Sequence, residues 1–374
     1  MGTRPVKVLV VAVAVAVVLG AGLTSAVALG GRSHDTRRRV LTAAPVDATS
    51  TVVPPVVTGD EPSTTAAVAP GAEPPSSASP PPTTWAITTS TPPAVRKPKP
   101  AAVKATPPPT PGGPFRGFAA WVDVYDWSAA YTKGAPKIGP EAVDVMAAHG
   151  VQVLEIQSAK AEQPGGVLEP DLLGRWIARA HARGLRVVVW YLPTLVDAGV
   201  DVAKLTASAQ LGVEGLGVDI ESRAVADPTA RSAALVHVTG AIRAATRLPL
   251  QAITLPGVAT DVINLAYWPG FPWHAIASAY DVWTPMGYWT NRTPQSGYRD
   301  AYRYTRDNIN LLRSDLGNAS AVVTVAGGLA EQTTTGDVAG YIKACAELGC
   351  VGGGLYDFRT TADGLWPILA VLRR

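Results

Sequence analysis

The sequence predicts an α/β fold, a (β/α)8 TIM barrel formed by residues 115–374. This stretch has the usual length of one such barrel, about 250 residues. Strand-like and helix-like segments alternate strictly along it, which favours a parallel sheet. The turn after the first expected strand, DVYDW at residues 123–127, lacks the glycines of a phosphate-binding turn. A doubly wound, nucleotide-binding sheet of six strands is therefore the weaker alternative.

The expected elements follow from apolar runs and from helix start and stop signals. Pro170 and Pro228 stand where helices are expected to start, and Gly184 stands where a helix is expected to stop. The predicted strands are residues 117–125, 151–156, 186–191, 215–220, 250–255, 282–288, 321–325 and 351–356. The predicted helices are residues 140–149, 170–182, 200–210, 228–245, 258–264 with 273–279, 298–316, 337–348 and 365–372.

The residues before the barrel are predicted to form no domain. Residues 1–31 combine early cations with a long apolar run that ends in AVA at residues 26–28, a pattern typical of an export signal. The run is also long enough to span a bilayer, so a membrane anchor is the alternative. Residues 40–114 hold 19 of the 33 prolines, and we expect residues 32–114 to be a disordered linker. The barrel is therefore expected to be secreted or held on the outer face of the cell envelope.

Charge and cysteine content exclude several functions. Residues 1–114 carry 10 of the 32 Lys/Arg and 5 of the 29 Asp/Glu, which leaves 22 against 24 in the barrel. This slightly acidic balance lacks the basic footprint of a nucleic-acid-binding protein. No His/Cys cluster has metal-ligand spacing, and we expect no cofactor and a monomer. Cys345 and Cys350 can form a local disulfide or remain buried thiols.

Two acids at the end of the fourth expected strand are the strongest functional signal. Side chains alternate along a strand, so Asp219 and Glu221 leave it on the same face. A βα loop follows, and such loops form the catalytic rim of a (β/α)8 barrel. The pair therefore suits acid/base chemistry. A solvated strand end, or an ion pair with Arg223, is the alternative interpretation.

The other expected strand ends are rich in aromatic and acidic residues. Sugar rings stack on aromatic faces, and their hydroxyl groups hydrogen-bond to carboxylates, so this mixture favours a carbohydrate site. Tryptophan is also common in protein cores. The residues expected to contact substrate are Trp121, Asp123, Tyr125, Glu155, Trp190, Met286, Tyr288, Trp289 and Tyr356.

Two motifs resemble those of the family-18 glycoside hydrolases, the chitinase-like barrels. EGLGVDIE at residues 214–221 resembles the strand-four signature Asp-x-x-Asp-x-Asp-x-Glu, and MGYW at residues 286–289 resembles the strand-six Met-x-Tyr-Asp. The resemblance implies that Glu221 is the general acid, that Asp219 is its partner, and that Tyr288 contacts the substrate's acetamido group.

The chain departs from that family's pattern at three positions. Glu214 and Gly217 replace the first and middle aspartates of the strand-four signature, and Trp289 replaces the strand-six aspartate. An aspartate in strand one, combined with Asp-x-Glu in strand four, is also similar to the family-25 lysozymes. That weaker resemblance brings Asp123 or Asp126 into the site.

These features predict hydrolysis of a glycosidic bond in a cell-wall or extracellular polysaccharide. Glu221 would protonate the leaving oxygen, and an ionised Asp219 beside it would raise the Glu221 pKa. The second role is either the substrate's own 2-acetamido group or another carboxylate. The candidates for that carboxylate are Asp123, Asp126, Glu155 and Glu331. A non-catalytic carbohydrate-binding envelope protein, which Gly217 favours, and a purely structural envelope protein are the alternatives.

Overall fold

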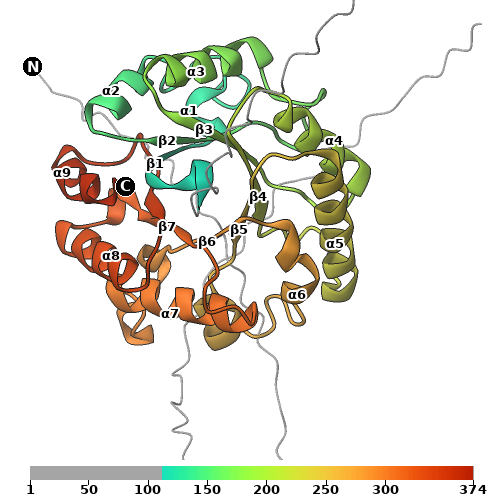
Figure 1. The fold of residues 1–374 in the computed structure, drawn as a ribbon, viewed down its shortest axis with the longest axis vertical. Coiled ribbons are helices and arrows are strands. Elements are labelled where there is room, and N and C mark those ends of the chain that lie inside the picture. Colours follow the sequence, from blue (N-terminus) through green and yellow to red (C-terminus); the bar gives the residue numbers. More distant parts are fainter. Residues whose placement is uncertain (1–111, 374) are drawn as a thin grey trace, which may run out of the picture. The chain divides into compact units, whose positions relative to one another are not determined.

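The computed structural model describes residues 112–373. Eight parallel strands run in the order β6-β5-β4-β3-β2-β1-β8-β7. Two isolated bridges, Trp283 with Val323 and Met286 with Ala326, join β6 to β7 and complete the ring. Figure 1 shows the helices surrounding the strands. The predicted (β/α)8 barrel is therefore confirmed, while the predicted export signal or anchor and nearly all of the predicted linker lie outside the described residues.

The elements alternate as expected from the sequence. The strands are β1 Gly117–Val122, β2 Val153–Gln157, β3 Arg186–Tyr191, β4 Gly215–Ile220, β5 Leu250–Thr254, β6 Val282–Pro285, β7 Thr324–Leu329 and β8 Gly352–Tyr356. The helices are α1 Val124–Trp127, α2 Ala142–Ala148, α3 Pro170–Ala182, α4 Ala198–Ala209, α5 Pro228–Ala245, α6 Trp273–Ile276, α7 Ala301–Asp315, α8 Thr335–Glu347 and α9 Trp366–Leu369. Shorter helical turns are η1 Gly113–Phe115, η2 Val258–Ile263, η3 Ala277–Ala279, η4 Trp289–Asn291, η5 Pro294–Ser296, η6 Ala330–Gln332, η7 Asp363–Leu365 and η8 Ala370–Leu372. None of the helices in this part of the chain is both long and apolar enough for a membrane span.

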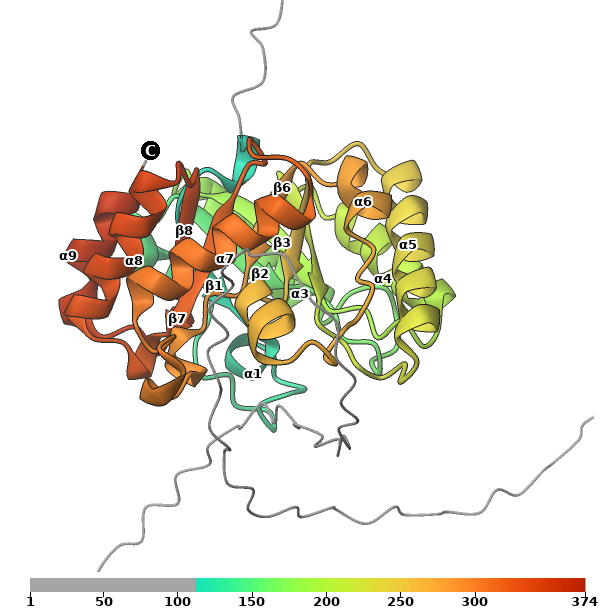
Figure 2. The same ribbon diagram turned by 90° about the horizontal axis from the view of Figure 1, so that it is seen from below.

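Several strand boundaries were predicted wrongly, and among them the sixth strand ends at Pro285 rather than at residue 288. The first strand ends at Val122, because the Asp123 carboxylate accepts a hydrogen bond from the Tyr125 amide at 2.7 Å and caps α1. Tyr125 therefore lies on a short helix beyond the strand end, and Figure 2 shows this helix at one end of the barrel. The seventh strand starts at Thr324, since its ladder with β8 begins at the pair Thr324 and Gly352.

The interior of the barrel consists of two apolar layers with polar side chains between them. The layer nearer the amino-terminal ends of the strands contains Phe115, Ala119, Val153, Val188 and Val282. The layer nearer the carboxyl-terminal ends contains Trp121, Trp190, Ile253, Met286 and Ala326. On β6, Thr284 stands between one residue of each layer. The second layer forms the floor on which a site at the carboxyl-terminal mouth rests.

Strand β8 approaches β1 so closely that its glycines leave no room for side chains. A Cβ atom on Gly354 would lie 2.0 Å from the backbone oxygen of Ala119, and one on Gly352 would lie 2.5 Å from that of Gly117. The glycine run at residues 352–354 lies within a strand, as predicted, where it permits the contact between β8 and β1.

Replacing Gly354 with alanine is expected to lower the free energy of unfolding by roughly 1–3 kcal/mol, since backbone must move to admit the methyl group. Urea unfolding of wild type and variant measures this difference. Gly364→Ala is the control, because a Cβ atom there meets nothing within 4 Å. Equal unfolding midpoints for Gly354→Ala and Gly364→Ala would contradict the packing argument.

Candidate active site

The acid pair lies at the carboxyl-terminal end of β4. Asp219 is 6% exposed and Glu221, just beyond the strand, is half-buried. Gly217 precedes them on the same face, and a Cβ atom there would lie 2.9 Å from Cβ of Trp190 and 3.0 Å from Cδ1 of Ile253. The glycine therefore makes room for the floor of the mouth, and Asp219 is the first side chain of β4 above that floor.

Burial makes this acid pair bind a proton more tightly than exposed carboxyl groups do. It raises the pKa of Asp219 well above its ordinary value, and the nearby charge of Glu221 raises that pKa further. Burial also raises the pKa of Glu221. Asp219 is the deeper of the two and faces the charge of its neighbour, so the proton belongs to the pair rather than to Glu221 alone.

Tyr288 lies where several carboxyl groups converge. It follows β6, and its pKa is raised well above the usual value by burial and then by the charges of nearby acids. Those acids are Glu221, Asp219, Asp123 and Asp357. The Tyr288 hydroxyl therefore stays protonated and can donate a hydrogen bond at the point where these carboxyl groups meet.

Aromatic rings extend from Tyr288 across the floor of the mouth. The ring centroids of Tyr288 and Tyr356 are 5.7 Å apart, those of Tyr356 and Trp121 are 6.4 Å apart, and those of Trp121 and Trp190 are 6.3 Å apart. Met286 belongs to the same apolar layer. The indole N–H groups of both tryptophans and Oδ1 of Asp219 are buried without a hydrogen-bond partner among residues 112–373. A ligand or water that reaches the floor can bond to them.

A second acidic group lies beside the ends of β1 and β8. The Tyr356 hydroxyl donates to Oδ2 of Asp123 at 2.7 Å, and burial raises the pKa of Asp123. Burial, followed by the charge of Asp126, raises the pKa of Asp357 to about 7. Asp126 is itself 2% exposed and accepts a hydrogen bond from Nε of Arg359. The sequence placed Asp357 at the rim, directly after β8, but sequence reasoning missed it as a site residue.

Lys160 is the other residue that sequence reasoning missed. It lies in the loop after β2, and its charge lowers the pKa of both Asp219 and Glu221. The sequence pattern does not predict where a lysine three residues beyond a strand lies, because its position depends on the path of the loop.

Several sequence-predicted residues lie away from the acid pair. Glu155 is 2% exposed inside the barrel, where Oε1 accepts a hydrogen bond from Nε2 of Gln251 at 3.3 Å. Trp289 is fully buried against Tyr341, with ring centroids 5.6 Å apart. Glu331 is exposed in η6. Tyr125, 41% exposed, is at the rim on α1, with its ring edge-on to that of Tyr131 at 5.6 Å.

The position of Glu155 predicts a pH-dependent stability. Burial raises its pKa to about 8 from an ordinary 4.5, so the unfolded chain ionises this group at lower pH than the folded chain does. The Glu155 contribution to stability therefore falls as pH rises from about 4.5 to about 8, and then levels off. At pH 8 we expect the free energy of unfolding of Glu155→Gln, measured with urea, to exceed that of wild type by on the order of 1–3 kcal/mol. Near pH 4 this difference should vanish. A difference that stays the same at both pH values would contradict the burial of an uncharged acid.

Residues 112–373 contain no group of three or more His, Cys, Asp or Glu side chains that could hold a metal ion. Cys345 and Cys350 are both buried and form no disulfide.

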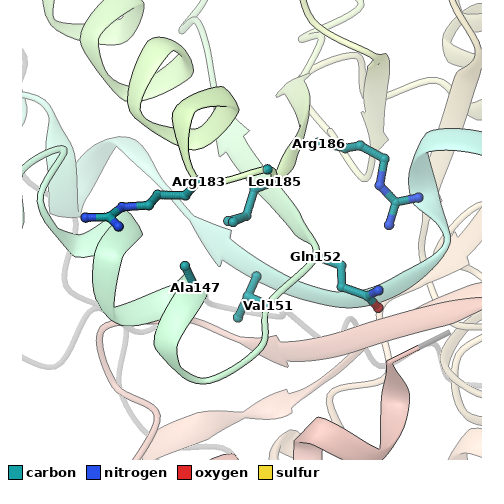
Figure 3. A pocket seen from close by; sticks show the side chains of 7 residues that line it. Ala147, Val151, Gln152, Arg183, Leu185 and Arg186 are labelled. Carbon is teal, nitrogen blue, oxygen red and sulfur yellow. The ribbon is translucent and has the colours of Figure 1, made fainter.

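A hollow of about 370 Å³ lies at the opposite end of the barrel, beside the amino-terminal ends of β2 and β3 (Figure 3). Its two arginines already have partners. Nε of Arg183 donates to Oδ1 of Asp144 at 2.7 Å, and Nη1 of Arg186 donates to the backbone oxygen of Gly113 at 3.1 Å. We therefore place the candidate site at the mouth.

The sequence matches no protein-family model and no curated protein. Among solved structures, the chain is similar to the spore cortex-lytic enzyme SleL of Bacillus megaterium, with 13% identity, a TM-score of 0.50, and coverage of 69% of this chain and 74% of SleL. SleL of Bacillus cereus gives 11% identity, a TM-score of 0.50 and the same two coverages. A chitinase of Chromobacterium violaceum gives 15% identity and a TM-score of 0.47, with coverage of 69% of this chain and all of the chitinase. At these identities the likeness to the two SleL structures shows the fold alone, a (β/α)8 barrel.

Proposed function

We propose that the barrel is a glycoside hydrolase that cleaves a cell-wall or extracellular polysaccharide. The observation that carries this proposal is the proton-holding pair of Asp219 and Glu221 at the barrel mouth, next to an aromatic floor. An acid that must protonate a leaving oxygen near neutral pH needs a raised pKa, and burial raises the pKa of both groups here. The aromatic floor offers apolar faces on which sugar rings stack.

In the proposed mechanism, Glu221 donates the proton to the leaving oxygen as the bond from that oxygen to the anomeric carbon breaks. The carbonyl oxygen of the substrate's 2-acetamido group bonds to the anomeric carbon, oriented by Asp219 and Tyr288. Glu221 then removes a proton from the water that attacks this carbon and opens the ring intermediate. Asp123 suits the attacking role less well, because its two oxygens already accept hydrogen bonds from Tyr356 and from the Tyr125 amide.

We further propose that the protein acts outside the cell, either released or tethered at the outer face of the envelope. The apolar segment within residues 1–31 supports export, and the proline-rich residues 32–114 suit a spacer between the membrane or wall and the barrel. A cell-wall or extracellular glycan is the polymer that such a spacer would bring within reach.

A carbohydrate-binding protein without turnover is the second candidate. Gly217 favours it, because Trp190 and Ile253 fill the space that a side chain at this position would need. An aspartate there would require Trp190 to move, and Asp219 lacks the carboxyl neighbour that the family-18 signature would place below it.

The deciding experiment incubates the purified full-length chain with chitin oligosaccharides, peptidoglycan and α-linked glucans, and measures both binding and newly formed reducing ends. The hydrolase predicts reducing ends from a polymer that carries 2-acetamido sugars, and none from α-linked glucans. Binding without new reducing ends selects the carbohydrate-binding protein instead. If the chain neither binds any of these polymers nor releases reducing ends from them, both functions are excluded.

A further inference from the structure

Lys160 is a cation at the mouth that the proposed mechanism does not use. Its side chain is 22% exposed, and its Nζ lies 5.6 Å from the ring centroid of Tyr125 and 5.8 Å from that of Tyr131. The nearest carboxylate oxygen, Oε1 of Glu162, is 3.9 Å away. The ammonium group donates no hydrogen bond to any of residues 112–373, so its three donors remain available to a ligand.

The ion pair with Glu162 does not explain this position. The Glu162 side chain is 59% exposed, and its Oε1 already accepts a hydrogen bond from the Tyr131 hydroxyl at 2.7 Å. A long, solvated pair of this kind contributes little to stability. By comparison, the nearby Lys204 ammonium group donates to the backbone oxygens of Gln163 and Gly165, and is 4% exposed. Lys204 is thus satisfied within the fold, whereas Lys160 is not.

Lys160 also offsets part of the effect of burial on the pKa of the acid pair. Its positive charge lowers the pKa of Glu221, although protonation of a leaving group requires that acid to keep its proton. A negative group bound to Lys160 would cancel much of that charge, and the pKa of the acid pair would rise again. The cation is therefore best explained by a ligand that brings a negative charge.

We propose that Lys160 is a specificity-determining residue that binds a carboxylate on the sugar beside the scissile bond, so that the substrate is an acidic glycan. This inference rests on the proposed function. Tyr125 and Tyr131 restrict the lysine to the rim, and Asp219 and Glu221 define the position of the scissile bond nearby. The carboxylate belongs either to a lactyl ether on an amino sugar or to a uronic acid.

The test measures binding by calorimetry in a full-length chain that carries Glu221→Gln, which keeps the probes intact. The probes are peptidoglycan glycan strands freed of peptides by an amidase, hyaluronan oligosaccharides, and chitin oligosaccharides. The first carries lactyl carboxylates, the second carries uronic acids, and the third is neutral. Adding Lys160→Gln is expected to weaken binding of the preferred acidic probe roughly 10–100-fold, the range for a charge-assisted hydrogen bond. Binding of chitin oligosaccharides should change less than about twofold, since they make no such bond.

Two further variants make the comparison specific. Lys160→Arg keeps the charge and should retain most of the acidic-probe binding. Lys343→Gln is the matched control, because Lys343 also lies over a tyrosine ring, 4.9 Å from the centroid of Tyr302, but on α8. It should leave all three affinities unchanged. Whichever acidic probe depends on Lys160 identifies the source of the carboxylate.

A pH profile separates recognition from an indirect effect on the acid pair. With Glu221 present, the alkaline limb of kcat should lie at higher pH for the acidic probe than for chitin oligosaccharides, because the probe's carboxylate offsets the charge of Lys160. Lys160→Gln should move the limb for chitin oligosaccharides to higher pH, since it removes the charge that lowers the Glu221 pKa. Equal losses on acidic and neutral probes, or no loss on either, would overturn the proposal while leaving hydrolysis intact. Absence of binding and hydrolysis for all three probes in the wild-type chain would overturn this inference together with the proposed function.

Discussion

Replacing Glu221 with glutamine is expected to lower kcat roughly 10²–10⁴-fold, the usual contribution of a positioned general acid. Glutamine has nearly the same shape but cannot donate a proton to the leaving oxygen. The fold should not suffer, because burial already disfavours the charged form of Glu221. Reducing-end release from the polymer that wild type cleaves measures turnover, and urea unfolding at pH 7 measures stability.

The Glu141→Gln variant is the control for this substitution. Glu141 is exposed at the start of α2, and the same chemical change there should leave turnover and unfolding unaltered. Wild-type turnover in Glu221→Gln would remove this residue from the mechanism. A large drop in its unfolding midpoint would show instead that the carboxyl group supports the fold.

Replacing Trp289 with alanine should lower the free energy of unfolding by about 3–5 kcal/mol, the cost of deleting a large aromatic ring from a core. The ring is fully buried, lies against Tyr341, and comes so close to Gly328 that a Cβ atom there would be 2.5 Å from it. Urea unfolding measures the loss. A change below about 1 kcal/mol would show that the ring is not packed in the core.

The adjacent residue provides the comparison. Tyr288→Phe keeps the ring and removes only the hydroxyl group that faces the acid pair, so it should change the unfolding midpoint little while lowering turnover. If Trp289→Phe, which keeps an aromatic core residue, lost turnover as strongly as Tyr288→Phe, then the tryptophan would have to reach the substrate.

Local patterns predicted the barrel and the orientation of the acid pair because these depend on alternation along single strands. Asp219 and Glu221 needed only the period of two within β4. The same rule misplaced Tyr125, where the Asp123 side chain caps a helix and ends the strand. It also could not place Trp289, because the chain turns after Gly287, whose amide bonds to the backbone oxygen of Ala326 at 2.6 Å.

Residues from irregular segments could not be predicted in this way. Lys160 and Asp357 reach the mouth through loops whose course depends on contacts distant in sequence, such as the bond from the Arg359 side chain to Asp126. The depth at which Glu155 lies inside the barrel could not be predicted for a different reason. Its face was predicted correctly, but β2 continues to Gln157, and the carboxyl group lies in the polar layer beneath the floor of the mouth.

The junction between β6 and β7 forms a line along the barrel where neighbouring strands are joined less regularly than elsewhere. Every other neighbouring pair of the described strands shares a ladder, although the one between β7 and β8 is interrupted between Ala326 and Leu329, whereas β6 and β7 are joined by two isolated bridges. Tyr288 lies on one side of the line and Tyr356 on the other, while Asp219 and Glu221 are tied to Tyr288 through β5. Any widening of the mouth along this line is expected to separate the two tyrosines, while Tyr288 and the two acids keep their relative positions.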